Sequence, residues 1–311
     1  MVRYSFQQHV PPDYERSYPV PLYQEARHRA LTAAAWTSFF LVRADLKKIF
    51  AEVHFLISGD QALSRPAAPF GAISFDGTLP LAELQRFIQA MDRALQDLAC
   101  RTITLVHPPA PYQQHADVIL ALLQDAGYRQ TATELAALIP VTEAPFDSRL
   151  HAWESRKLRQ AKQAALRCGR ISIDQGAQVY RFLQRCREER SQKLSMTEEQ
   201  ILELIRCCPD AIRLYTAEQE NSLAAAVLAV HDHPDILYTF YYGHAAALDE
   251  ISPVVRLMEH VYADCAASGI SLLNLGTSTV NGATYLPLLQ FKLHLGAIPA
   301  RKVTVTKTIG T

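Results

Sequence analysis

The stretch that decides the fold is Leu273-Asn274-Leu275-Gly276-Thr277-Ser278, followed by Gln290-Phe291-Lys292-Leu293-His294-Leu295-Gly296-Ala297. The apolar residues at 270–275 predict a buried strand that ends in a polar turn with a glycine. The residues 285–295 predict a helix, and Gly296 suits the position behind a helix end. The C-terminal part of the chain therefore alternates strands with helices.

Upstream of this stretch, the pattern continues with a strand at 171–174 and a helix around 179–186. A second helix begins at Thr197, which has the spacing of a capping box with Gln200. A meander of three strands and a helix opened by Ser252 and Pro253 follow. These three strands are predicted at 211–216, 223–230 and 236–242. A last strand is predicted at 301–309.

The first half of the chain carries a similar series. We expect strands at 49–57 and 70–75, a helix at 81–100, a strand at 102–107, a helix around 118–123 and a strand at 128–141. Its last four elements match the helix, strand, helix and strand that close the second half. The sequence therefore predicts a mixed α/β fold of two tandem domains, residues 1–148 and 149–311.

Composition narrows the class of protein. The 311 residues are 49% hydrophobic, 31 Lys and Arg balance 31 Asp and Glu, and only 12 residues are glycine. The chain lacks the glycine-rich motifs of dinucleotide and P-loop sites and the G-x-S-x-G elbow of esterases. No stretch resembles a secretory signal or a membrane span, and no C-x-x-C pair occurs, so we expect a cytoplasmic protein with reduced cysteines.

The order of elements and the opening stretch together resemble the FemAB-like transferases, which have two tandem GNAT domains. In that family a strand ends in an Asp-x-Gly-x-Ser type of turn, and the next helix carries Phe-Lys and closes with Gly. Asn274 stands where the family often has Asp. The resemblance extends more faintly to Arg187-Glu188-Glu189-Arg190. It implies transfer of an acyl or aminoacyl group from an activated donor to an amine acceptor in the cleft between the domains.

Site residues follow from this resemblance. Lys292 would face the reacting carbonyl and stabilise its developing negative charge, and Tyr242 or His244 would move the proton of the attacking amine. Phe291, Asn274 and Ser278 would contact the substrate. Arg187 and Arg190 lie three residues apart, on one helical face, and would hold a carboxylate or phosphate. Simpler explanations also exist. Lys292 would be a surface lysine, Tyr242 and His244 would be packed aromatic residues, and the two arginines would serve solubility.

The donor is acyl-CoA or aminoacyl-tRNA by resemblance, with no permanently bound cofactor and no metal. The turn where GNAT enzymes hold the coenzyme diphosphate reads Gly243 to Ser252, without its usual glycines and with two acids, Asp249 and Glu250. These features count against acyl-CoA, although the helix start at Ser252 could hold another anion.

The segment 149–170 is the one strongly basic stretch, with seven basic residues against a single acid. In one helix it would present fixed cations to the phosphates of tRNA. The residues concerned are Arg149, Arg156, Lys157, Arg159 and Lys162. A solvated helix is the alternative.

Two other hypotheses remain beside the transferase. One is a non-catalytic ligand-binding protein with a degenerate GNAT fold, and the other is an RNA-associated protein that uses the basic segment. His107, which precedes Pro108 and Pro109 at a strand end, is expected either to border the cleft or to cap an element. The sequence leaves the oligomeric state open.

Overall fold

The computed structural model describes residues 3–65, 68–280 and 282–309. The chain forms two compact units, one of residues 1–134 and 300–311 and the other of residues 135–299. This division differs from the predicted boundary at residue 148, because the last strand pairs in the first unit although it follows the second unit in the chain. Strand pairing, and not chain order, assigns that strand.

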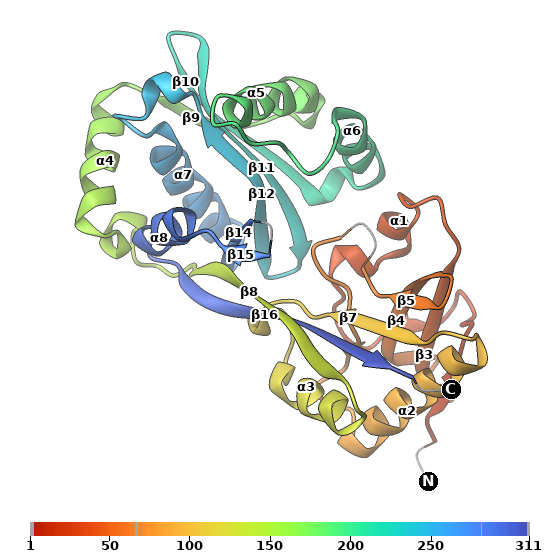
Figure 1. The fold of residues 1–311 in the computed structure, drawn as a ribbon. Helices are drawn as coiled ribbons and strands as arrows, with labels where there is room; N and C mark the ends of the chain where they lie inside the picture. Colours follow the sequence, from red (N-terminus) through yellow and green to blue (C-terminus); the bar gives the residue numbers. More distant parts are fainter. Residues whose placement is uncertain (1–2, 66–67, 281, 310–311) are drawn as a thin grey trace. The chain divides into compact units, whose positions relative to one another are not determined.

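The first unit has a mixed sheet covered by α2 and α3. Its strands lie in the order β1, β3, β4, β5, β7, β16 and β8, and β2 and β6 pair with β4. Figure 1 labels β3, β4, β5, β7, β16 and β8 of this sheet. The elements are β1 (Ser5–Gln7), β2 (Glu15–Arg16), η1 (Leu22–Gln24), α1 (Ala26–Arg29), β3 (Trp36–Arg43), β4 (Lys48–Ser58), β5 (Gln61–Leu63), β6 (Ser74–Phe75), α2 (Leu81–Asp97), β7 (Thr102–Val106), η2 (Ala110–Tyr112), α3 (Ala116–Asp125), and parts of β8 (Arg129–Pro140) and β16 (Ile298–Thr308).

The core of this unit forms where one face of α2 packs on the sheet. Leu84, Ile88, Met91 and Leu95 are fully buried, at the three- and four-residue steps that the sequence shows. The predicted strand 70–75 is largely wrong. Only Ser74–Phe75 is a strand, because Phe70 and Ile73 are buried in a loop instead. Strand β3 was not predicted, since its apolar residues do not alternate.

The second unit has a sheet in the order β8, β13, β12, β11, β10 and β9, with α7 buried against it (Figure 1). Its elements are η3 (Phe146–Arg149), α4 (Ala152–Gln163), β9 (Arg167–Ile171), η4 (Ile173–Gln175), α5 (Gly176–Glu188), α6 (Glu198–Cys207), η5 (Pro209–Ala211), β10 (Ile212–Gln219), β11 (Ser222–His233), β12 (Ile236–His244), η6 (Ala246–Leu248), α7 (Pro253–Ala267), β13 (Leu272–Thr277), β14 (Thr279–Val280), β15 (Ala283–Thr284) and α8 (Leu286–His294).

Local signals in the second unit are mostly confirmed. Thr197 and Gln200 form the predicted capping box at the start of α6. The strand expected at 171–174 instead ends at Ile171, because Ser172 begins a 3-10 turn by accepting a hydrogen bond from the Asp174 amide. The six cysteines are thiols, as predicted. No helix within the described residues has the length and apolar character needed to span a bilayer.

Candidate active site

The candidate site lies where β12 and β13 separate. The two strands pair in parallel from Ile236 and Leu272 to Tyr238 and Asn274. Strand β12 then continues to His244 and β13 to Thr277 without further recorded pairing between their described residues. The facing edges of these carboxyl ends can thus face a substrate, while β12 stays paired with β11 up to His244 and β13 with β8 at Thr277.

A tight turn ends β13. Gly276 has a φ of +75°, a conformation that residues with a Cβ rarely adopt, and a Cβ there would come within 3.1 Å of the Tyr238 ring. The Asn274 side-chain oxygen accepts a hydrogen bond of 2.8 Å from the Gly276 amide. Asn274, predicted to bind substrate, therefore uses this oxygen to hold the turn.

Lys292 is the most unusual residue of the site. Its side chain is 1% exposed, although it lies on the short helix α8. Its Nζ donates hydrogen bonds to the carbonyls of Gly276 at 3.0 Å and Thr277 at 2.7 Å. Burial, together with the nearby charge of Arg187, lowers the pKa of Lys292 to about 7. An ammonium has three N–H donors, so one is left for a further acceptor.

Two hydroxyls in this part of the second unit are buried without a partner. The Tyr242 hydroxyl and the Ser278 hydroxyl make no hydrogen bond among the residues that the structure describes. Burial raises the pKa of Tyr242 well above its ordinary value, so the phenol stays protonated. Buried polar groups normally find a partner. Ser278 directly follows Thr277, whose carbonyl binds Lys292, and Arg187 lies near both Tyr242 and Lys292, so the two unpartnered hydroxyls favour a place for a polar ligand in this part of the unit.

The two arginines that the sequence pairs have different surroundings. Arg187 donates a hydrogen bond of 2.7 Å to Gln192, and its charge helps burial to lower the Lys292 pKa and partly offsets the burial that raises the pKa of Tyr242. Arg190 instead donates to the carbonyls of Cys186 and His244 and pairs with Asp249 at 2.6 Å. Arg187 thus lies near the buried Lys292, whereas Arg190 links the end of α5 to the loop after β12 by hydrogen bonds.

That loop, which includes η6, is where a coenzyme diphosphate would be expected. The Ala246 amide donates to the Glu189 carboxylate at 2.9 Å, and His244 Nε2 lies 2.8 Å from the Asp249 carboxylate. Burial and the charge of Arg190 lower the pKa of His244. Ser252 precedes α7 as predicted, but its side chain makes no capping hydrogen bond and its φ is +46°. Protein carboxylates therefore already bind the polar groups of this loop. Glu189 was not identified from the sequence as one of them.

Phe291 and Tyr242 are partly buried and pack against the same core of the second unit. No hydrogen bond joins His244 to Lys292 or Tyr242 among the described residues. The described part of the chain also contains no group of three metal-ligating side chains. The roles predicted for these residues stay predictions.

The basic segment is not one continuous helix. Helix α4 ends at Gln163, and Arg167 and Arg170 lie on β9. Several of its cations have partners within the second unit: Arg149 donates to Tyr262 at 2.6 Å, Lys157 to the Asp249 carbonyl at 2.9 Å, and Lys162 pairs with Glu259 at 2.8 Å. Arg156 stacks on Trp153, and Arg159 is exposed. These contacts indicate that the segment mainly stabilises the second unit.

Comparison with known proteins bears on the fold of the chain. Residues 152–285 match the model of the GNAT acetyltransferase domain. The structure is similar to that of FemX, with a TM-score of 0.68 and 10% identity over 93% of this chain and 92% of that one. No curated protein matches the sequence at a significant level.

Two further structures are similar. The C-terminal domain of a putative lysylphosphatidylglycerol synthetase from Agrobacterium fabrum has a TM-score of 0.58 and 11% identity over 83% of this chain and 81% of that one. L-PGS from Bacillus licheniformis has a TM-score of 0.56 and 11% identity over 86% and 83%. These likenesses show the fold. The chain has the GNAT fold, as its sequence predicts, and it is similar in structure to FemX.

Proposed function

We propose that this protein transfers an acyl or aminoacyl group to an amine at the separated ends of β12 and β13, with Lys292 stabilising the transition state. The observation that carries the proposal is the environment of Lys292, which is buried, bound to two backbone carbonyls and not paired with a carboxylate of the described residues. Keeping a cation in such a place is costly, and active sites are where such perturbed groups gather.

In the reaction, the nitrogen of the acceptor amine attacks the carbonyl carbon of a thioester or ester donor. The third N–H of the Lys292 ammonium donates to the carbonyl oxygen as it becomes negative. The intermediate then expels the thiolate or alkoxide, and the amide forms. The protonated Tyr242 phenol is suited to donate a hydrogen bond to the leaving group, and the proton of the amine passes through His244 or water to the departing thiolate or alkoxide.

Two features of the second unit bear on the donor. Glu189 already accepts from the Ala246 amide, and Asp249 lies beside it with Arg190 and His244 as partners. A diphosphate in that loop would have to displace one carboxylate and approach another. This favours a donor ester that does not place a diphosphate there, such as an aminoacyl ester, over acyl-CoA. The proposal assigns no tRNA contact to the basic segment.

Titration calorimetry with acetyl-CoA, a longer acyl-CoA and an aminoacyl-tRNA tests the donor. If none binds, the transferase proposal fails and the non-catalytic alternative replaces it. For a donor that binds, Lys292→Met should lower kcat about a hundredfold while the donor Kd stays nearly unchanged.

The control is Arg190→Ala, which changes the loop without removing the buried cation. We expect its kcat to stay far closer to that of the unmodified protein than the kcat of Lys292→Met does, because Arg190 bonds loop groups and not Lys292. Unchanged turnover of Lys292→Met would remove Lys292 from the mechanism.

A further inference from the structure

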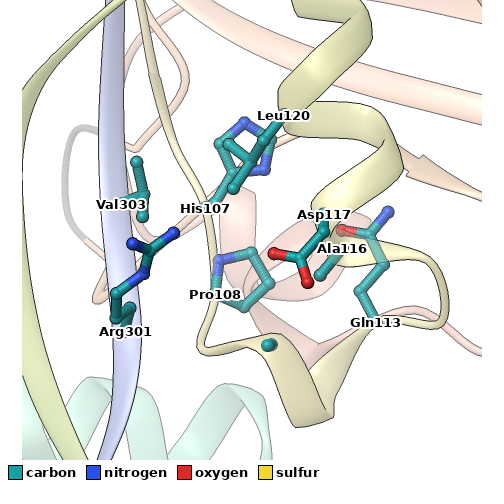
Figure 2. Close-up of a pocket in the computed structure, with 9 residues that line it drawn as sticks. His107, Pro108, Gln113, Ala116, Asp117, Leu120, Arg301 and Val303 are labelled. Atoms are coloured by element: carbon teal, nitrogen blue, oxygen red, sulfur yellow. The ribbon is translucent and has the colours of Figure 1, made fainter.

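The first unit contains a cavity of its own, apart from the site proposed above. Its volume is about 320 Å³, close to the lower end for ligand pockets, which begin at roughly 300 Å³. It lies between the end of β7, the start of α3 and β16, and all its lining residues belong to the first unit (Figure 2). A cavity of this size suits a metabolite and not a polymer.

His107 lines this cavity and is 4% exposed. Its Nε2 is buried and has no hydrogen-bond partner among the described residues. Burial lowers the pKa of His107 to about 4, so the imidazole is neutral at physiological pH. A neutral imidazole nitrogen can accept or donate one hydrogen bond, and leaving it unmade is costly. The geometry thus supplies an unused polar group beside the cavity.

The start of α3 also borders the cavity. Its N-cap residue, His115, has a φ of +60° and makes no capping hydrogen bond with its side chain. Ala116 and Asp117, in the first turn of the helix, line the cavity. Uncapped amides at a helix start favour a negatively charged group of a ligand.

Two opposite charges complete the lining. In Figure 2, the Arg301 guanidinium and the Asp117 carboxylate lie on opposite sides of Pro108, with the His107 imidazole above. Both side chains belong to exposed residues, and neither forms an ion pair within the described part of the chain. A guanidinium binds a carboxylate through two parallel hydrogen bonds, and a carboxylate binds an ammonium. Leu120 and Val303 add apolar wall.

From this arrangement we propose that the cavity binds a free α-amino acid with an apolar side chain. Arg301 and the first amides of α3 hold its carboxylate, Asp117 holds its ammonium, and His107 supplies one further hydrogen bond. Leu120 and Val303 contact the side chain. A simple anion fits less well, because Asp117 would repel it.

Titration calorimetry with L-leucine, L-phenylalanine and L-alanine, each on the whole protein, tests this. At least one should bind, and Arg301→Ala and Asp117→Asn should each weaken its binding about tenfold or more, as expected for the loss of a charged hydrogen bond. The N-acetyl derivative and the amide of the same amino acid, which lack one charge each, should bind at least tenfold more weakly.

The matched control is Arg93→Ala, which removes an exposed arginine of α2 in the same unit outside the cavity. Its affinity should equal that of the unmodified protein. The proposal is overturned if none of the three amino acids binds, if the N-acetyl derivative binds as well as the free amino acid, or if Arg301→Ala binds as well as Arg93→Ala. Melting temperatures of the ligand-free variants show that each variant is folded.

Discussion

The end of β7 in the first unit and the end of β13 in the second come at the same point of one element order. A helix, a strand and a second helix follow one another in both, as α2, β7 and α3 and as α7, β13 and α8. The seventh residue of α8 is Lys292, whose ammonium donates hydrogen bonds to the last two carbonyls of β13. The seventh residue of α3 is Leu122, which packs on the core.

The two strand ends therefore have different chemistry on similar frames. At the end of β13 lies a buried cation, next to Ser278, whose hydroxyl has no partner among the described residues. After the end of β7 lies a cavity with a neutral histidine and two exposed opposite charges. We propose different roles for the two places because a few residue types differ: stabilisation of negative charge at the end of β13 and binding of a small dipolar molecule at the end of β7.

The largest effect on stability should separate the two buried lysines. Lys302 of the first unit is 7% exposed and pairs with Glu134 at 2.6 Å, so Lys302→Met leaves a carboxylate without its cation. We expect a loss of about 2 kcal/mol in the free energy of unfolding. Lys292→Met should stay within about 1 kcal/mol of the unmodified protein, because relief of burying the ammonium offsets two lost hydrogen bonds.

Denaturant unfolding of both variants measures this difference. If Lys292→Met lowers the free energy of unfolding more than Lys302→Met does, Lys292 mainly stabilises the fold. The expected difference between the two buried lysines is then absent.

A smaller difference in stability is expected between two glycine variants, one of them in the turn at the end of β13. Gly276→Ala places a Cβ at a φ of +75° and 3.1 Å from the Tyr238 ring, while Gly269→Ala has a similar φ of +72° and open space around it. The second change should cost about 1 kcal/mol and the first about 1 kcal/mol more, since only Gly276 adds a close contact. Equal losses in thermal unfolding would mean that the Tyr238 ring does not constrain this turn.

The smallest effect is expected at the start of α3. Asp117 lies in its first turn, where a negative charge is favourable, whereas α8 has no acid in its first turn. Asp117→Asn should lower stability by about 0.5 kcal/mol. Asp125→Asn, at the opposite end of the same helix, should raise it slightly. If both changes act in the same direction, the helix dipole does not set the charge preference at this cavity.

Much of the fold could be predicted from the sequence, because its signals are local. The capping box of Thr197 and Gln200 and the apolar face of α2 depend on residues a few positions apart. The place of the last strand could not be predicted, since its pairing with β7 joins Thr304 to Val106 across most of the chain. Strand β3 was missed for want of alternation.

The candidate site was predictable in part. Resemblance singled out Lys292, Tyr242 and Ser278, but their burial depends on tertiary packing that no local pattern records. The bond between Glu189 and the Ala246 amide joins residues far apart in the chain, so the occupied loop could not be foreseen. The cavity at His107 likewise needs β16, which comes from the other end of the sequence.

The most direct test of the central claim is an NMR titration of the Lys292 side chain in protein labelled at lysine Cε, with Lys292→Met to assign the signal. The account predicts a pKa of about 7, well below the ordinary lysine value of about 10.4. Because the folded pKa is then below the unfolded one, this group adds stability as pH rises from about 7 to about 10. A titration midpoint near 10.4 would contradict the claim that burial in the site destabilises the Lys292 ammonium.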